Sequence, residues 1–245
     1  MENIEYRKLA EMEDHMWWFR ALHANFLMLL GRFLEEPKGR LLDEGCGTGG
    51  QLFSIRRAFP GIDAFGIDIS PWAAAMAREK SGARVTVGSV NELPFADGQF
   101  AAIVSSDVLY HARVDDAAAV RGAYRCLAPG GVLIIHAPAY EWLRGAHDEQ
   151  VHTARRYTRS GVSDLLTEAG FNLAYTTYWN TLLFPLMVLR RKVFRPREGG
   201  SDVMAYPALV EALFGGVMAI ELGLLRLGLW LPFGGSVMAV GVKHD

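Results

Sequence analysis

The sequence predicts an α/β fold: a doubly wound, mostly parallel sheet of seven strands with helices on both faces. Two observations predict it. Short apolar stretches alternate with helical patterns between residues 40 and 137, and such alternation is typical of parallel sheets. The first stretch runs directly into a glycine-rich turn, LLDEGCGTGG at residues 41–50, as a strand does when it brings its backbone close to a ligand.

The length of 245 residues fits one large α/β domain or two small ones, and we take residues 1–245 to be a single domain. Half of the chain is hydrophobic (51%), enough to fill a core, and the formal net charge of −2 gives no reason to expect nucleic-acid binding. The two cysteines, Cys46 and Cys126, exclude a disulfide scaffold and suit a reducing cytoplasm. The acidic first residues lack the apolar core of a secretory signal, and no apolar run of 18 residues is free of charges and helix breakers. We therefore expect a cytoplasmic protein without an ordinary transmembrane helix.

The elements are expected in a regular order. A helix at 6–34 carries three adjacent aromatic residues, Trp17, Trp18 and Phe19, which cannot all face one core. We therefore interpret residues 1–36 either as a core-packing helix or as a lid over a ligand. Ser70 and Pro71 predict a helix start, because serine caps a helix and proline fits its first turn. Strands are expected at 40–43, 64–69, 85–87, 100–105, 132–137, 171–178 and 236–243, and the other helices at 51–59, 72–80, 115–127 and 160–169.

Residues 180–235 form a strongly apolar segment between the last two strands. Its basic patch lies at 190–197 and its longest helical stretch at 206–230. One interpretation is a helical subdomain that packs on the core or forms a homodimer interface. The other is a pocket for a lipophilic substrate, or a contact with an anionic membrane surface.

Two kinds of cofactor fit the glycine turn. Gly45-x-Gly47-x-x-Gly50 matches the dinucleotide fingerprint, as in an NAD-type reductase. However, Asp43 stands so close to the turn that it would repel a pyrophosphate, whereas it would attract a ligand with a positively charged amino group. Asp68, at the end of the second strand, can accept hydrogen bonds from ribose hydroxyls of either cofactor.

Residues 41–174 resemble class I S-adenosylmethionine-dependent methyltransferases. LLDEGCGTGG resembles the first motif of that family, GIDIS (66–70) its ribose-binding motif, residues 88–111 its adenine-binding and following region, and LAPGGVLII (127–135) its approach to strand five. The resemblance implies a Rossmann-like sheet whose last strand is antiparallel, and S-adenosyl-L-methionine as cofactor. The cofactor residues that it implies are Asp43, Gly45, Cys46, Gly47, Asp68, Ile69, Ser89, Val90 and Ser106.

One position departs from the family pattern. The family often places Asp after the glycine that follows strand three, whereas this chain has Ser89. A hydroxyl accepts a hydrogen bond from the adenine amino group more weakly than a carboxylate does, so the N–H of Val90 carries more of the recognition. Cys46 is interpreted as a small residue that fills the turn.

The flanking segments EDHMWWFR (13–20) and 138–158 resemble bacterial small-molecule methyltransferases, in part those of ubiquinone biosynthesis that methylate oxygen. We therefore expect methyl transfer to a small or lipophilic acceptor, with oxygen favoured over nitrogen or carbon. A hydroxyl acceptor needs a general base, and the candidates are His111, His147 and His152, with Asp148 available to orient either of the last two. Trp18, Tyr110, Arg156 and Tyr157 are the expected acceptor-binding residues.

Two alternatives stay open at this point. The polar cluster around residues 147–156 is equally well explained as a structural network that closes one side of the site. No histidine, cysteine or carboxylate spacing is typical of a metal site. The whole protein is either an enzyme or a methyltransferase-like interaction module that binds the cofactor without turnover.

Overall fold

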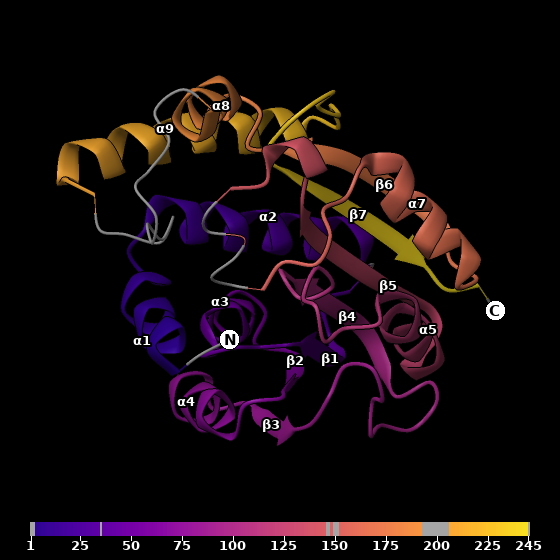
Figure 1. The fold of residues 1–245 in the computed structure, drawn as a ribbon. Coiled ribbons are helices and arrows are strands. Elements are labelled where there is room, and N and C mark those ends of the chain that lie inside the picture. Colours follow the sequence, from indigo (N-terminus) through magenta and orange to yellow (C-terminus); the bar gives the residue numbers. More distant parts are fainter. Residues whose placement is uncertain (1–2, 35, 146–147, 149–151, 193–205, 245) are drawn as a thin grey trace.

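The sheet has seven strands, as predicted, and only β7 runs against its neighbours. The computed structural model describes residues 3–34, 36–145, 148, 152–192 and 206–244. The strand order is β3-β2-β1-β4-β5-β7-β6 (Figure 1). β7 pairs antiparallel with both β5 and β6, whereas the other neighbouring strands pair in parallel. The predicted doubly wound, mostly parallel sheet is confirmed.

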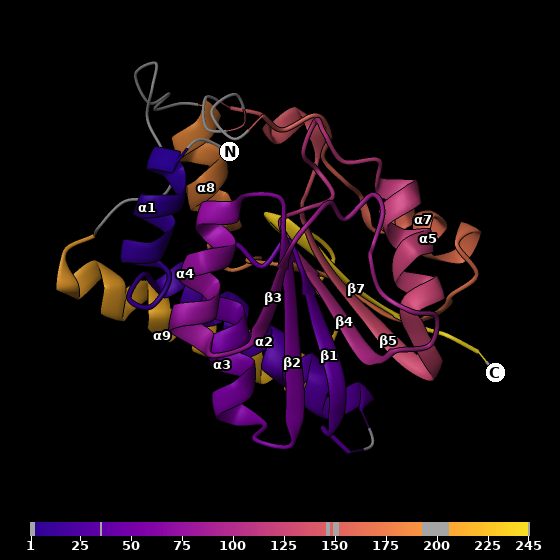
Figure 2. The same ribbon diagram turned by 90° about the horizontal axis from the view of Figure 1, so that it is seen from below.

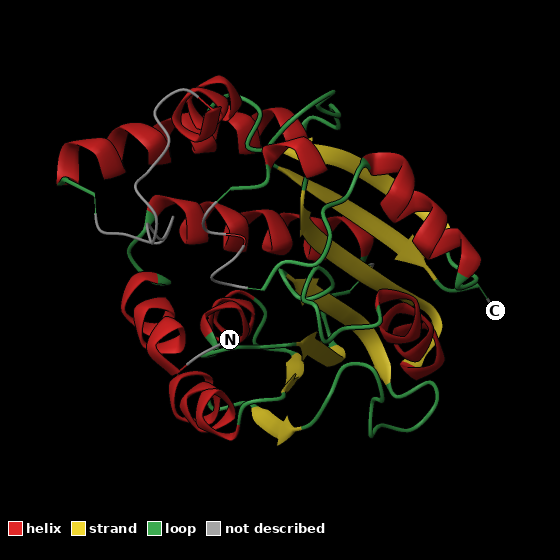
Figure 3. Ribbon diagram, in the orientation of Figure 1, coloured by secondary structure: helices red, strands yellow, loops and turns green. Residues whose placement is uncertain are grey.

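The order of helices and strands follows the predicted alternation (Figure 3). The strands are β1 (Gly39–Glu44), β2 (Ile62–Asp68), β3 (Arg84–Val87), β4 (Phe100–Ser106), β5 (Leu127–Pro138), β6 (Asn172–Trp179) and β7 (Ser236–Val242). The helices are α1 (Asn3–Met12), α2 (Trp17–Phe33), α3 (Gly50–Ala58), α4 (Pro71–Ser81), α5 (Asp116–Cys126), the short 3-10 helix η1 (Glu141–Leu143), α7 (Arg159–Glu168), α8 (Phe184–Lys192) and α9 (Ala208–Arg226).

Two apolar layers hold the helices on the sheet, one on each face. α2, α3 and α4 cover one face and α5 and α7 the other (Figure 2). Successive strand residues alternate between the layers: Leu41 packs with the α2 side and Leu42 with the α5 side, and both are buried. Because both faces of β4, β5 and β7 are covered, these strands read as largely apolar runs, which made them recognisable in the sequence.

The N-terminal segment differs from its prediction as one helix over 6–34. It forms two helices, α1 and α2, with a break at 13–16. At the break the Glu13 carboxylate turns inward and accepts hydrogen bonds from Thr48 Oγ1 (2.8 Å) and Gly50 N–H (3.2 Å). These bonds anchor the chain to the glycine turn, so α1 lies beside α4 while α2 packs on the sheet (Figure 1).

The apolar segment at 180–235 contains α8 and α9. Among the described residues, α9 is one helix long and apolar enough to cross a membrane by length and composition, although the sequence pattern predicted none. The sequence pattern excluded this stretch because it carries charged residues, but both of its acidic side chains face inward. Glu211 accepts from Trp17 N–H (2.7 Å), and Glu221 accepts from Thr181 N–H (3.1 Å) and Leu182 N–H (2.9 Å). These bonds fasten α9 to α2 and to the turn that precedes α8.

Candidate functional site

The glycine turn after β1 brings bare backbone to the carboxyl end of the sheet. Gly45 and Cys46 donate their N–H groups to Ile67 O at 2.7 and 3.0 Å, which holds the turn against β2. Gly45 has φ +67°, and a Cβ there would lie 2.5 Å from Val108 Cγ2. Only glycine fits this conformation and this space, so the turn is shaped to leave room beside it.

Asp68, at the end of β2, is the centre of the hydrogen bonds at this edge. Its carboxylate accepts from Gly47 N–H (2.9 Å), Ser70 N–H (2.8 Å) and Tyr6 Oη (3.1 Å). The first two bonds come from backbone and fix the orientation of the carboxylate. The third comes from α1, so the N-terminal segment already contacts the residue expected to hold ribose hydroxyls, and burial raises the pKa of the Tyr6 hydroxyl.

Asp43, on β1, places a buried carboxyl group at this edge of the sheet. It is 2% exposed, and its Oδ2 has no hydrogen-bond partner among the described residues. Burial is the main cause that raises its pKa well above the usual range, and the charges of Asp68 and Glu13 add to the effect. A cation placed here would relieve this unfavourable burial, as the sequence argument for a positively charged ligand requires.

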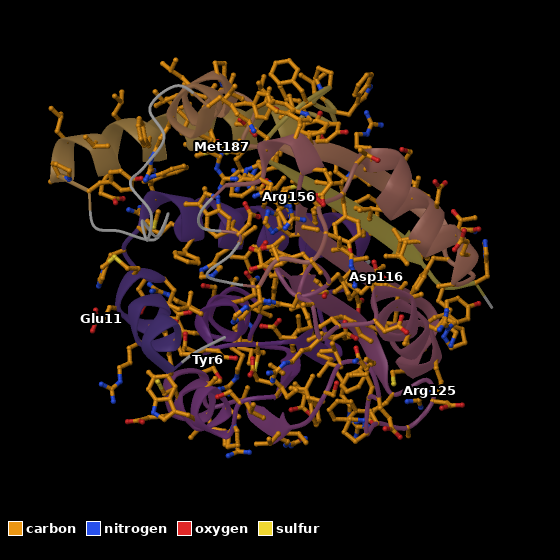
Figure 4. The ribbon with its side chains drawn as sticks, viewed as in Figure 1. Tyr6, Glu11, Asp116, Arg125, Arg156 and Met187 are labelled. Atoms are coloured by element: carbon orange, nitrogen blue, oxygen red, sulfur yellow. The ribbon has the colours of Figure 1, made fainter. Side chains whose placement is uncertain are left out.

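A cavity of about 1450 Å³ opens from the glycine turn toward α2 and α8. Figure 4 shows Tyr6 on α1, Met187 on α8 and Arg156, all three of which line it. Every residue expected to bind the cofactor also lines this cavity: Asp43, Gly45, Cys46, Gly47, Asp68, Ile69, Ser89, Val90 and Ser106. Burial raises the pKa of the Cys46 thiol well above its usual value, in keeping with a residue that fills the turn.

The residues expected to bind the acceptor divide into two groups. Trp18, Tyr110 and Arg156 line the cavity, and Trp18 meets Trp179 at a ring-centroid distance of 5.6 Å. Tyr157 is not among the lining residues. Its hydroxyl contacts Leu109 O (3.0 Å) and Asp116 Oδ2 (2.7 Å), so it packs beneath the strand ends.

Two of the three candidate histidines, His111 and His152, line the cavity. His147 lies outside the described residues. Asp148, which was expected to orient a histidine, forms a paired contact with Arg156, from Nε to Oδ1 (2.8 Å) and from Nη2 to Oδ2 (3.1 Å). Arg156 also donates to Ala139 O (2.8 Å), so the arginine and the aspartate form a structural network that closes one side of the cavity.

Several lining residues were missed in the sequence. Glu13 and Gln51 line the cavity, and both amide atoms of Gln51 are buried without partners among the described residues. Asp107 and Asn180 line it too, and both adopt left-handed backbone conformations, with φ of +57° and +61°. Glu13 and Asp107 lie inside segments that resemble the family, at 13–20 and 88–111, but nothing in the sequence singled them out, whereas Gln51 and Asn180 lie in no such motif. Within the described part of the chain, no group of three or more histidine, cysteine or acidic side chains is placed to hold a metal ion.

The sheet order, the glycine turn and the acids at the ends of β1 and β2 define the class. This is the fold and cofactor site of class I S-adenosylmethionine-dependent methyltransferases, and S-adenosylmethionine is the cofactor. The positively charged amino group of its methionine moiety suits Asp43, and its ribose hydroxyls suit Asp68. Residues 42–135 match the family described as methyltransferase domain, and the chain contains a domain of that family.

Two individual relatives match parts of the chain. The chain is 30% identical over 185 residues to an uncharacterized 37.1 kDa protein in transposon TN4556 of Streptomyces fradiae, covering 72% of this chain and 53% of that protein. It is 34% identical over 107 residues to the demethylmenaquinone methyltransferase of Thermus thermophilus, covering 42% of this chain and 48% of that one. The chain therefore spans about half the length of these two relatives.

A solved structure shows the same fold over nearly the whole chain. It is the complex of the Haloferax volcanii Trm112 methyltransferase activator with a methyltransferase, which superposes with a TM-score of 0.65 at 23% identity. The match covers 99% of this chain and 95% of that one. The N-terminal helices and the segment with α8 and α9 thus fall within the compared region.

Proposed function

We propose that this protein transfers a methyl group from S-adenosylmethionine to a small, lipophilic acceptor, and that the acceptor atom is oxygen. The observation that carries the proposal is the single cavity in which the cofactor residues and a largely apolar wall meet. Methyl transfer is an in-line displacement on an already activated sulfonium carbon. The protein therefore has to position the acceptor and exclude water.

The apolar wall supports the choice of a lipophilic acceptor. Trp17 and Trp18 contribute to it from α2, and Leu186 and Met187 from α8. A volume of about 1450 Å³ leaves space for an acceptor beside the cofactor, since ligand pockets commonly measure roughly 300–1,000 Å³. The name of the Thermus relative, a demethylmenaquinone methyltransferase, points to the same kind of substrate.

The choice of oxygen rests on the candidate bases in the cavity wall. His111 and His152 come from different segments, yet they are held side by side, because Ala112 N–H donates to His152 O (3.1 Å). We propose one of these two histidines as the general base that takes the proton from an acceptor hydroxyl.

The test is a screen of lipophilic phenols, quinols and hydroxylated lipids for formation of S-adenosylhomocysteine, with the site of a labelled methyl group read by mass spectrometry. We expect Asp68→Ala to abolish turnover with every acceptor. We expect either His111→Gln or His152→Gln to lower kcat about 10²- to 10⁴-fold without changing cofactor affinity. His244→Gln, at an exposed position, is the matched control.

Two results would contradict the proposal. Label on nitrogen or carbon would disprove the choice of oxygen, while leaving the methyltransferase activity in place. Tight binding of S-adenosylhomocysteine with no turnover across the screen would favour a cofactor-binding interaction module. We place the reaction in the cytoplasm.

A further inference from the structure

One side of the molecule, at the top of Figure 1, exposes apolar side chains from α8, from α9 and from the segment after α9. We call it the apolar face. On α9, Leu209 is 81% exposed, Leu213 61% and Ile220 62%, and together they form a stripe along the helix. Trp230 and Phe233 extend it beyond the helix, at 58% and 43%. Aromatic and aliphatic side chains exposed together over this length mark an interaction surface.

On the described residues of this face, the acidic side chains are turned inward or paired. α9 has two acids, and both Glu211 and Glu221 point inward to backbone N–H groups. Close to the face, the exposed Glu141 is paired with Arg144, which contacts both of its carboxylate oxygens, at 2.7 and 2.8 Å.

Positive charge, in contrast, lies next to the exposed aromatic rings. The Arg159 guanidinium lies 4.8 Å from the ring centre of Trp230, and the Lys192 ammonium 6.0 Å from that of Trp142. Arg226 is exposed at the end of α9. Trp rings beside cations, next to aliphatic side chains, are the arrangement that favours the boundary between acyl chains and anionic headgroups.

The apolar face also continues into the cavity. Leu186 and Leu189, on α8, line the cavity and are 49% and 43% exposed. Phe184 of the same helix contacts Phe233, with ring centres 5.5 Å apart, so the cavity wall and the apolar face share one helix. A lipophilic molecule held at this face would meet the cavity entrance without crossing water.

We propose that the apolar face docks on the surface of an anionic phospholipid bilayer, and that the acceptor enters the cavity from that bilayer. The second half of this statement rests on the proposed function, whereas the docking itself does not. A second copy of the chain is a less suitable partner. A two-fold interface brings the same surface of both copies together, and therefore also their Arg226 and Lys192 side chains, whereas an anionic bilayer offers the opposite charge.

The test is co-sedimentation of the full chain with vesicles at low salt. We expect binding to phosphatidylcholine mixed with phosphatidylglycerol and much weaker binding to phosphatidylcholine alone. The double variant Leu213→Asp with Ile220→Asp, and separately Arg226→Glu, should each lower the partition coefficient, the former more than tenfold. Leu173→Asp is the matched control, because Leu173 is also an exposed leucine (40%) but lies at the start of β6.

Calorimetric titration with S-adenosylhomocysteine, on the same proteins, separates the two proposals. Unchanged affinity in the double variant shows that it is folded and that only docking is lost. Equal binding to neutral and anionic vesicles would overturn the assignment of an anionic surface. No binding to either vesicle would overturn the docking proposal, as would a dimer in solution that the double variant dissociates. Vesicle binding by a chain that does not bind the cofactor would refute the proposed function and leave the docking intact.

Discussion

At the scale of single residues, Gly49 cannot easily be replaced, because its backbone has a positive φ and because Ala77 of α4 lies close to it. It is the N-cap of α3 with φ +92°, and a Cβ there would lie 2.7 Å from Ala77 Cα of α4. We expect Gly49→Ala to lower the free energy of unfolding by about 2–4 kcal/mol, since backbone strain and a collision with backbone add. The measurement is urea denaturation.

Gly130→Ala separates the two causes. Gly130 also has a positive φ, +73°, but nothing lies within 4 Å of the Cβ that would be added. We expect it to cost about 1–2 kcal/mol, from strain alone. Equal costs for the two variants would show that the contact with Ala77 relaxes freely.

His23, buried on α2, makes stability depend on pH. Burial lowers its pKa from 6.5 to about 4, and its Nδ1 lies 3.2 Å from Ser54 Oγ. Between these two pH values the unfolded chain binds the proton and the folded chain does not, so stability falls as pH falls through this window. The full difference amounts to about 3 kcal/mol, because one pKa unit corresponds to about 1.4 kcal/mol.

The check is to compare unfolding free energies of the wild type and His23→Gln at pH 7 and pH 4.5. The wild type should lose more stability than the variant over this interval. The same loss in both proteins would assign the acid sensitivity to other groups. Glu13 is not one of them, because burial raises its pKa and its protonation at low pH therefore favours the folded state.

At the scale of elements, one lysine holds the N-terminal segment to the cofactor turn. Lys80 of α4 contacts Glu13 (2.7 Å) and Asp14 (2.7 Å), and Glu13 is buried. We expect Lys80→Ala to leave the Glu13 carboxylate without its counter-ion and to release α1, at a local cost of about 1–3 kcal/mol. Hydrogen exchange of residues 3–12 should then become faster.

Arg84→Ala provides the comparison, because Arg84 pairs with Asp63 at 2.9 Å in a far more exposed contact. Such surface pairs contribute about 0–1 kcal/mol. If hydrogen exchange in α1 is the same in Lys80→Ala, Arg84→Ala and the wild type, then Tyr6 and the apolar contacts alone hold the helix.

The elements also show where sequence reasoning succeeds and where it stops. Strands β4, β5 and β7 were recognisable because burial on both faces makes them largely apolar. The start of α4 was recognisable because Ser70 accepts from Ala73 N–H (3.3 Å), as a cap does. β5 begins at Leu127 instead of Val132, since Leu127 pairs with Phe100 before a shift in register. That pairing joins two strands that are distant in sequence, so no local sequence pattern predicts it.

The same limit applies to the candidate site. The cofactor residues follow strand ends with a recognisable motif, and all of them line the cavity. The break before α2 depends on the hydrogen bonds of Glu13 with Thr48 and Gly50. Because these residues are distant in sequence, no local pattern predicts the break. Asn180 lines the cavity only because the fold places the end of β6 beside it, which the local sequence does not predict. Tyr157 was expected to line the acceptor pocket because of its residue type. Its hydroxyl instead contacts Leu109 O and Asp116 Oδ2.

At the scale of the whole molecule, the cofactor should stabilise the fold. A ligand at about 100 times its Kd adds about 2.7 kcal/mol, which for a chain of this size raises Tm by roughly 5–10 °C. We expect S-adenosylhomocysteine to give such a shift in differential scanning fluorimetry. Asp68→Ala should abolish the shift, and NAD should give none with either protein. A shift with NAD would contradict the assignment of the cofactor.

The position of β7 between β5 and β6 also has a consequence for folding order. β6 precedes β7 in the chain but has no partner strand in the sheet other than β7. While a ribosome is still producing α8 and α9, β6 therefore cannot dock and β5 keeps an open edge. The apolar α9 emerges during this interval, before the strand that completes the sheet. A nascent chain stalled between β6 and β7 would accordingly be the species most in need of a chaperone or a nearby membrane.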